Sequence, residues 1–360
     1  MESRAAVVTK RNEPLEIWSI PIPDLAPGSI LVKVEAATLC GTDAHRWQGH
    51  LAANDSPFVP GHETCGTIVE MRGELYDVLG VPLKRGDRVI SSYSHCGHCY
   101  YCRIARQTTL CEKNTPYGTW HPDKLMGGCA DYHIFPPGAS IVRVPDEVSS
   151  PLAASAACAL RTVLHGFEQL GAILGYESVL ILGAGPLGLY SAAVARDRGA
   201  RGVFLIGAPA GRVEVARAWG ADAVLDLDEV PQLDDRIAWI RERTGGRGAD
   251  VAINCANSPA FVESMQMVRP GGRVVNIGVT GGPPLSLPPD LLFRQIRVNT
   301  VVMAEARHFY EAIDFLATRR TKFPFERLFS NRYSLDRTTE ALRRMAAFQE
   351  VKPIIIPSAS

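Results

Sequence analysis

Four cysteines lie within sixteen residues of this chain: Cys96, Cys99, Cys102 and Cys111. Three thiols at three-residue steps, followed by a fourth after a short loop, can converge on one point as a tetrahedral cage. Zinc favours soft sulfur and takes this closed form in structural sites. A disulfide between residues three positions apart is sterically awkward. The spacing therefore predicts a structural zinc lobe at about 93–113 rather than a cluster of buried or disulfide-bonded cysteines.

A second chemical motif is glycine-rich: Gly183, Ala184, Gly185, Pro186, Leu187 and Gly188. It stands between an apolar strand expected over 178–182 and a helix expected over 187–198. In such a motif the first glycine makes the turn, the second lets a pyrophosphate approach the backbone, and the third packs helix on strand. The helix N-terminus then offers free N–H groups to the phosphates. The motif predicts a dinucleotide site, with a purely structural glycine turn as the alternative.

The end of the next expected strand bears on the choice of dinucleotide. An acidic residue there would bond the adenosine ribose and repel a 2′-phosphate. This chain has Gly207 instead, and Arg212 follows five residues later. We therefore favour NADP, with use of NAD or of both as the alternative. Arg212 either supplies a cation to the phosphate or only covers the adenine.

The bulk composition limits the classes of function. The 360 residues exceed what one hydrophobic core normally serves, which favours two domains. Lys plus Arg equals Asp plus Glu at 38 each, which argues against nucleic acid or an anionic membrane as a partner. No apolar run approaches the roughly 20 residues of a bilayer span, and the N-terminus has no signal-peptide core. Nine cysteines, partly in metal-type spacing, fit the reducing cytoplasm.

These motifs need elements to position them. Residues 1–154 show short β segments broken by Pro and Gly, for example 30–35, 66–70 and 88–90. A helical stretch over 151–170 leads into alternating elements: strands at 178–182, 202–206, 223–225, 251–254 and 273–277, and helices at 187–198, 212–219, 235–243 and 261–267. Apolar strands alternating with helices predict a doubly wound parallel α/β sheet, the Rossmann fold, over 155–300. Residues 301–360, with helices near 308–317 and 338–347, are expected to return to the first domain.

Further candidate metal ligands are scattered: Cys40, His62 and Cys158. Taken singly, each is more typical of a buried side chain than of a ligand. However, Cys-Gly-Thr-Asp at 40–43, Gly-His-Glu at 61–63, the four-cysteine lobe and the glycine-rich turn occur in the order and spacing of the zinc-dependent medium-chain alcohol dehydrogenases. The chain resembles that family over essentially its whole length. Its Cys-Gly-Thr-Asp form resembles the polyol and threonine dehydrogenase branch.

The resemblance implies a GroES-like catalytic domain over 1–154 and a second, catalytic zinc held by Cys40, His62 and Cys158. Glu63 either enters the coordination sphere transiently or bonds within its domain. Asp43 either accepts the other ring N–H of His62 or caps a turn.

Further roles follow from the same resemblance. Thr42 and His45 match a proton relay that runs through the nicotinamide ribose, although His45 could instead be an ordinary surface histidine. Thr162 matches a residue that presses the nicotinamide ring toward the zinc, and Gly278 and Val279 are placed at the coenzyme. The family commonly has seven residues where eight separate Cys102 from Cys111 here, so a longer loop is expected.

The implied activity is hydride transfer between an alcohol and NAD(P) in a cleft between the domains, by a homodimer or homotetramer acting on a small alcohol or carbonyl compound. Two alternatives are a zinc-free enone or quinone reductase of the same fold and a non-catalytic dinucleotide-binding protein. Substrate-pocket candidates, chosen by proximity to the motifs, are Trp47, Ser92, Tyr93, Trp120 and Leu125. Two tryptophans favour a fairly large or cyclic secondary alcohol.

Overall fold

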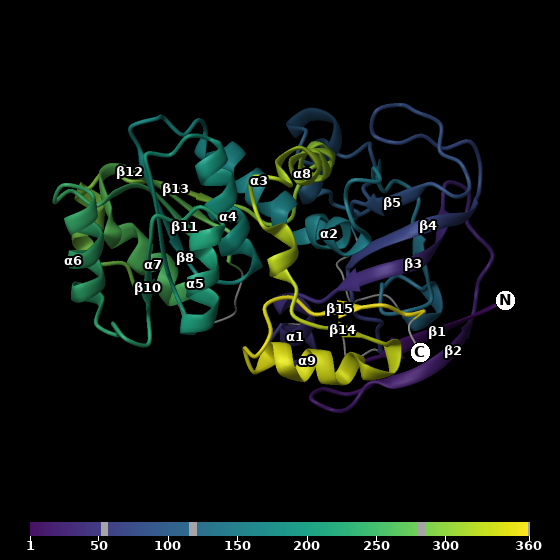
Figure 1. The fold of residues 1–360 in the computed structure, drawn as a ribbon. Coiled ribbons are helices and arrows are strands. Elements are labelled where there is room, and N and C mark those ends of the chain that lie inside the picture. Colours follow the sequence, from purple (N-terminus) through teal and green to yellow (C-terminus); the bar gives the residue numbers. More distant parts are fainter. Residues whose placement is uncertain (52–56, 115–120, 279–284, 359–360) are drawn as a thin grey trace. The chain divides into compact units, whose positions relative to one another are not determined.

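A computed structural model describes residues 1–51, 57–114, 121–278 and 285–358. The chain divides into two compact units (Figure 1). The first contains Met1–Cys158, Glu305–Arg319 and Leu328–Ser360, and the second contains Ala159–Ala304 and Arg320–Arg327. The boundaries expected at 154 and 300 thus each precede a unit boundary by four residues. Among the described residues, no helix has the length and apolarity that crossing a bilayer requires.

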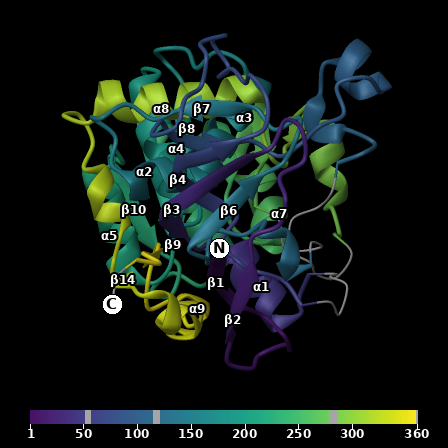
Figure 2. The same cartoon turned by 90° about the vertical axis from the view of Figure 1, so that its right-hand side faces the viewer.

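The first unit is mostly β-structure (Figure 2). Its strands are β1 (Glu2–Val7), β2 (Glu16–Pro21), β3 (Ile30–Thr38), β4 (Glu63–Met71), β5 (Arg88–Ser91), β6 (Tyr132–Phe135), β7 (Ile141–Arg143), β14 (Arg332–Tyr333) and β15 (Ile354–Ile355). β1 and β2 form an antiparallel pair, and a seven-stranded sheet has the order β14-β15-β3-β4-β5-β7, with β6 also paired to β3. Because side chains alternate across a strand, Leu31 joins one hydrophobic cluster while Ile30 and Val32 join another.

The α-helices described in the first unit are α1 (Gly41–Gln48), α2 (Ser150–Ser155), α8 (Ala306–Arg319) and α9 (Thr338–Ala346). α2 packs on β3 and β4, and α9 packs on α1. The last strand, β15, runs antiparallel to β3, with Ile354 opposite Thr38. The C-terminal strand is therefore built into the same sheet as the N-terminal strands, whereas Arg320–Arg327, within the expected return of residues 301–360, belongs to the second unit.

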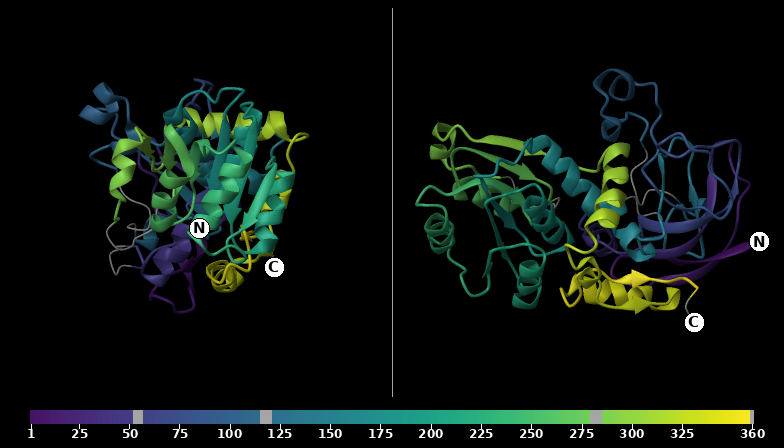
Figure 3. Two further views of the ribbon diagram at one scale, coloured as in Figure 1. Left: turned by 90° about the vertical axis from the view of Figure 1, so that its left-hand side faces the viewer. Right: turned by 45° about the horizontal axis from the view of Figure 1, so that its top comes forward.

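The second unit contains a six-stranded sheet in the order β10-β9-β8-β11-β12-β13, with every pair of neighbours parallel (Figure 3). Its elements are β8 (Ser178–Leu182), β9 (Gly202–Gly207), β10 (Ala223–Asp226), β11 (Ala249–Asn254), β12 (Val268–Asn276), β13 (Arg297–Thr300), α3 (Arg161–Leu170), α4 (Pro186–Asp197), α5 (Ala210–Ala218), α6 (Leu233–Arg243) and α7 (Ser258–Met267). Helices α3, α4 and α5 pack in sequence as one group, and α6 packs on α7 as another. The predicted doubly wound α/β fold is confirmed, and β8 is buried along its whole length as a central parallel strand requires.

The helical stretch expected over 151–170 is not one regular helix. A π-helical segment, Ala156–Leu160, separates α2 from α3. Helix propensity in this alanine-rich stretch does not distinguish i→i+4 from i→i+5 bonding, so the irregularity could not be predicted from the residues alone. Its consequence is local: the π segment carries Cys158, one of the candidate metal ligands.

Candidate functional site

Cys40 lies at the N-terminus of α1, as its N-cap residue. The Thr42 backbone N–H donates to Cys40 Sγ at 3.3 Å. Burial alone would raise the pKa of the Cys40 thiol, but hydrogen bonding with Cys158 and the nearby His62 imidazole outweigh it and lower the pKa well below its usual range. A thiol at a helix N-terminus beside an imidazole is thereby prepared to act as a thiolate ligand.

The three candidate ligands of the catalytic metal converge in the first unit. His62 Nε2 lies 3.3 Å from Cys40 Sγ and 3.3 Å from Cys158 Sγ. Zinc bonds of about 2.3 Å to sulfur and 2.0 Å to nitrogen, at tetrahedral angles, separate such atoms by about 3.5 Å. The donor set and its spacing therefore fit one zinc ion with two thiolates and one imidazole. A zinc ion bound by these three residues would have a fourth position for a further ligand.

Asp43 connects the segments that carry Cys40 and His62. It is fully buried, and its carboxylate accepts the backbone N–H of Cys40 at 2.9 Å and of Gly61 at 3.0 Å. Its Oδ1 also lies 3.5 Å from His62 Nδ1. The two roles considered for Asp43, capping a turn and facing His62, are thus combined in one side chain, because the loop before His62 packs on the start of α1.

Glu63 is bonded within the first unit. Its carboxylate accepts a hydrogen bond from Lys352 Nζ at 2.6 Å and another from the Thr38 hydroxyl, and both Glu63 and Lys352 have no exposed surface. Thr38 and Glu63 are partners across β3 and β4. A Glu63 carboxylate oxygen also lies within 4.8 Å of the ligand atoms of Cys40, His62 and Cys158.

Lys352 was not anticipated from the sequence. The signal available was a single lysine inside the apolar C-terminal stretch 351–356. Burial alone would lower the pKa of its ammonium, but the Glu63 carboxylate raises it, so Lys352 stays cationic at neutral pH. The C-terminal segment thus supplies the counter-charge of Glu63, which follows the candidate metal ligand His62.

The two relay candidates lie on α1. Thr42 is in its first turn and the partly buried His45 in its last. A second imidazole, which no motif in the sequence had indicated, lies beside His45: His50 Nδ1 is 3.4 Å from His45 Nδ1. Burial and the proximity of His50 both lower the pKa of His45. His45 is therefore neutral, and able to accept a proton, at neutral pH.

A cavity in the first unit adjoins His62. Its wall is formed by His62, Ser91, Ser92, Tyr93, Ser94, Met126, His133, Pro136, Ala157 and Phe309. Of the substrate-pocket candidates, Ser92 and Tyr93 lie in this wall. His133, Met126 and Phe309 were not anticipated, because they come from β6, the loop before it and α8, far from the ligand motifs in sequence.

Two substrate-pocket candidates are corrected by the structure. Trp47 is buried in the main core of the first unit, and its indole N–H donates to the Glu13 carbonyl at 2.8 Å. Leu125 has no exposed surface and belongs to the same core. Neither lines the cavity, since proximity in sequence to a motif does not determine which way a side chain points. Trp120 lies outside the described residues.

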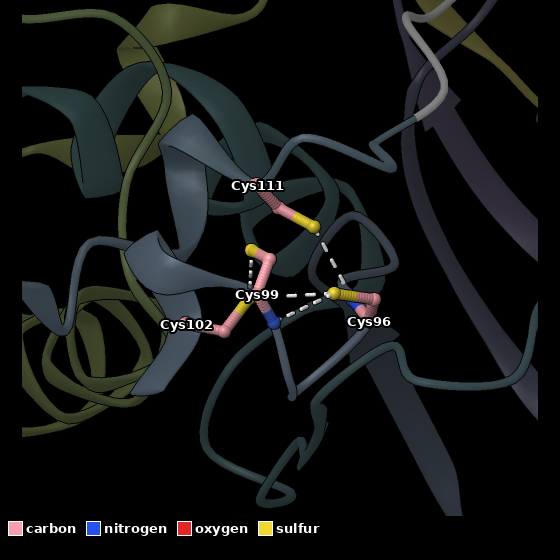
Figure 4. Close-up of side chains that lie close together, drawn as sticks. All are labelled: Cys96, Cys99, Cys102 and Cys111. Atoms are coloured by element: carbon pink, nitrogen blue, oxygen red, sulfur yellow. Dashed lines mark hydrogen bonds between the residues drawn. The ribbon is translucent and has the colours of Figure 1, made fainter. Parts of the chain in front are cut away.

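The four cysteines of the expected zinc lobe also converge (Figure 4). Cys102 Sγ is 4.0 Å from Cys96 Sγ and 3.5 Å from Cys99 Sγ, and all four sulfurs lie within 4.8 Å of one another. Tetrahedral zinc separates its sulfur ligands by about 3.8 Å. All nine cysteines of the chain are free thiols, so the disulfide alternative is excluded in this structure.

The cysteine lobe is bound to the start of α8 by one carboxylate. Glu305, which is almost fully buried, accepts the backbone N–H of Thr108 at 3.0 Å and of Thr109 at 3.2 Å. Both threonine hydroxyls donate to it as well. The short loop before Cys111 thereby has its free N–H groups satisfied by a residue almost 200 positions away.

The glycine-rich turn of the second unit has the form that a dinucleotide requires. Gly183 has a φ of +113°, and a Cβ on Gly188 would lie 1.8 Å from the Gly183 carbonyl oxygen. The side of Gly185 on which a Cβ would stand is open. Pro186 is the first residue of α4. The backbone N–H that proline lacks would have no partner within the helix at this position. An open Gly185 at a helix N-terminus fits a pyrophosphate.

The other coenzyme candidates are also found near strand ends or in helices. Gly207 ends β9, and a Cβ there would lie 2.7 Å from Ala184 Cβ and 2.8 Å from Ala184 N. A Cβ on Gly278 would lie 2.1 Å from the Ala256 carbonyl oxygen. Arg212 is in the first turn of α5, where burial lowers its pKa, and Thr162 is buried in α3. Val279 lies outside the described residues.

Comparison with known proteins agrees with this geometry. Residues 26–146 match the alcohol dehydrogenase GroES-like domain, and residues 186–318 match the zinc-binding dehydrogenase domain. The 5-exo-hydroxycamphor dehydrogenase of Pseudomonas putida is 32% identical, covering 98% of each chain. An alcohol dehydrogenase of Thermotoga maritima has a TM-score of 0.91 at 28% identity, covering 99% of this chain and 100% of that one. A putative zinc-binding dehydrogenase of Sinorhizobium meliloti bound to NADP has a TM-score of 0.85 at 30% identity, with the same coverage.

Proposed function

The chain belongs to the zinc-type medium-chain alcohol dehydrogenases, an oxidoreductase family, and from this membership we propose that it interconverts a secondary alcohol, fairly large or cyclic, and its ketone. The observation that carries the proposal is the convergence of Cys40, His62 and Cys158 beside a cavity, with His62 Nε2 3.3 Å from each of the two sulfurs. Bound zinc would supply a Lewis acid for the substrate oxygen, and a bound nicotinamide coenzyme would supply the hydride acceptor.

The chain's own residues have distinct tasks in this proposal. Cys40, His62 and Cys158 hold the metal, and Asp43 fixes the loop that carries His62. Thr42 and His45 take up the alcohol proton and release it to solvent, since a neutral imidazole accepts a proton near neutrality. Glu63, held by Lys352, is proposed to stay within its domain and to balance the charge near the metal.

For the coenzyme we propose NADP. The support is the absence of a carboxylate at Gly207, together with Arg212 in the following helix and a relative of 30% identity bound to NADP. The four-cysteine lobe is proposed to hold a second, structural zinc. By analogy with the family, the working form is a homodimer or homotetramer.

The decisive experiment measures zinc per chain and turnover with both coenzymes. We expect two zinc ions and oxidation of a cyclic secondary alcohol with NADP, lost on replacing Cys158 by Ser. Reduction of an enone or quinone by zinc-free protein would instead favour the reductase of the same fold. Binding of coenzyme without turnover of any alcohol in the zinc-loaded protein would favour the non-catalytic alternative.

A further inference from the structure

A second cavity, the arginine cavity, lies in the second unit and has a volume of about 440 Å³. Its wall contains four arginines and one aspartate, completed by a glycine and a proline. These five charged residues are Arg241, Arg247, Arg269, Arg294 and Asp290. The volume lies within the roughly 300–1,000 Å³ that is usual for small-ligand sites. None of the wall residues takes part in the proposed reaction.

The arginine cavity lies at the opposite edge of the parallel sheet from the glycine-rich turn. Arg247 precedes β11, Arg269 stands at the start of β12, and Arg294 precedes β13. Because these strands run parallel to β8, their amino ends share one edge, whereas the turn at Gly183 follows the carboxyl end of β8. A dinucleotide binds at the carboxyl ends of such strands. The arginine cavity is therefore separate from the expected coenzyme site.

Two of the four arginines are held in the wall by bonds within the protein. Arg294 Nη1 donates to the carbonyls of Met265 and Gln266, at 3.0 and 3.1 Å, in the last turn of α7. Arg269 Nε donates to the Asp250 carboxylate at 2.7 Å. The carbonyls at a helix end need donors from outside the helix, so Arg294 has a structural task. These two residues supply fixed positive charge.

The other two arginines have no such bonds. Arg241 and Arg247 are exposed, and among the residues that the structure describes neither side chain makes a hydrogen bond or an ion pair. Glu242, the acidic neighbour of Arg241 in the sequence, is bound by Arg243 at 2.8 Å. An arginine in the last turn of a helix complements the helix dipole, which accounts for Arg241 in α6 but not for Arg247, which follows the helix.

The charges at the arginine cavity do not balance. Four guanidiniums have two carboxylates beside them, Asp290 in the wall and Asp250 bound to Arg269, which leaves a surplus of two positive charges. Arg294 shows the effect: burial lowers the pKa of its guanidinium, the Asp290 carboxylate raises it, and the Arg241 guanidinium lowers it again. An anion bound among these groups would remove the repulsion, and two negative charges would balance the surplus.

We propose that the arginine cavity is a second ligand site, which binds an oligophosphate group through Arg241 and Arg247. A guanidinium matches phosphate oxygens with paired N–H donors and keeps its charge at physiological pH. Among its described residues the wall has no aromatic and no large aliphatic side chain, so it offers no surface to a nucleobase, and the phosphates alone are recognised. The group can be free triphosphate or pyrophosphate, or the phosphate tail of a nucleotide.

The expected consequence is stabilisation of the second unit. A ligand held by Arg241 and Arg247 beside Arg269 and Arg294 would join the end of α6 to the starts of β12 and β13. A ligand that binds only the folded state raises the free energy of unfolding. The proposal does not depend on the proposed function, because the site takes no part in the reaction.

The test is calorimetric titration of the zinc-loaded full chain with sodium triphosphate at constant ionic strength, with and without saturating NADP. We expect one triphosphate per chain that NADP does not displace. Arg241→Gln with Arg247→Gln should weaken binding at least about tenfold, because two charged donors are lost. The matched control is Arg201→Gln with Arg320→Gln, two exposed arginines of the same unit outside the wall, which should change Kd less than about twofold.

Melting curves give a second measurement. Triphosphate should raise the melting temperature of wild type and of the control variant, but not of the variant that lacks Arg241 and Arg247. ATP in place of triphosphate identifies the source: comparable binding of both assigns a nucleotide tail as well as the free anion, and binding of triphosphate alone assigns the free anion.

Four results would overturn the proposal: no binding of triphosphate, full displacement by NADP, an equal loss of affinity in the control variant, or binding of ATP without triphosphate. Failure of the chain to oxidise any alcohol would contradict the proposed function and leave this site unaffected.

Discussion

At the scale of single residues, His45 lies beside another imidazole, that of His50. Its pKa is lowered by burial first and then by His50. A relay base must be neutral to accept a proton, so its activity is lost as pH falls through its pKa. Because His45 and His50 are five residues apart and lie side by side, the pH dependence of a reaction that uses His45 should depend on His50 as well.

We predict that the acid limb of alcohol oxidation lies below pH 6.5, the ordinary value for histidine. His50→Gln should move that limb to higher pH, because the repulsion that lowers the His45 pKa is removed. His45→Gln should lower turnover and abolish the limb, with partial rescue by imidazole. The measurement is kcat against pH for the three proteins, and an identical profile in all of them would show that the proton leaves by another route.

The buried pair of Glu63 and Lys352 gives a second prediction. Lys352→Met leaves the Glu63 carboxylate buried without its counter-charge, so the free energy of unfolding should fall by about 3–5 kcal/mol. The double variant Glu63→Gln with Lys352→Met should lose clearly less, because the uncompensated charge is gone. Denaturant unfolding measures both.

Lys33→Met, at an exposed position of β3, is the control for removing one lysine and should be nearly neutral. If the double variant were as unstable as Lys352→Met, the ion pair would not be the source of the loss. Packing of the long lysine side chain would then account for it.

At the scale of elements, the end of β9 and the glycine-rich turn are packed too closely for any side chain at position 207. A Cβ there would lie 2.8 Å from a backbone nitrogen of the turn. The missing carboxylate is therefore linked to packing as well as to coenzyme choice. A substitution to aspartate changes both at once, and a matched variant is needed to separate them.

The prediction uses Gly207→Ala and Gly207→Asp as that pair. Both should weaken coenzyme binding, because the turn must move. Relative to Gly207→Ala, Gly207→Asp should shift the ratio of kcat/KM values from NADP toward NAD, since a carboxylate repels the 2′-phosphate. Steady-state kinetics with both coenzymes decides it, and equal ratios in the two variants would show that charge at this position does not set the preference.

At the scale of the whole molecule, the two metal sites are expected to differ in what their loss does. The lobe offers four thiolates, and Glu305 binds it to α8, so a zinc ion bound there would contribute to folding. At the other site, Cys40, His62 and Cys158 lie beside a cavity while Glu63 is held by Lys352, so a zinc ion bound by these three would keep a position for substrate.

We predict two zinc ions in wild type and one in each of two variants. Cys99→Ser should lower the melting temperature markedly, whereas Cys158→Ser should abolish turnover with little change in melting temperature. Elemental analysis, calorimetry and kinetics together test this. One zinc or none in freshly purified wild type would contradict the prediction.

Local sequence was sufficient for much of this molecule. The strands at 178–182 and 202–206, the turn between them and the glycine at 207 follow from hydrophobic pattern and from backbone positions that exclude a Cβ. The cysteine lobe follows from spacing alone, because its ligands are local. The three scattered candidate ligands were proposed from family resemblance, and their convergence is a property of the fold.

Contacts between distant segments were decided only by tertiary structure. Lys352 reaches Glu63 because β15 pairs with β3, and Glu305 reaches Thr108 because α8 begins beside the lobe. His133 lines the cavity because of the face of β6 on which it lies. Trp47 packs in the hydrophobic core because it lies on the buried face of α1. A sequence states which side chains can bond, but the sheet register and the packing of elements determine which of them meet.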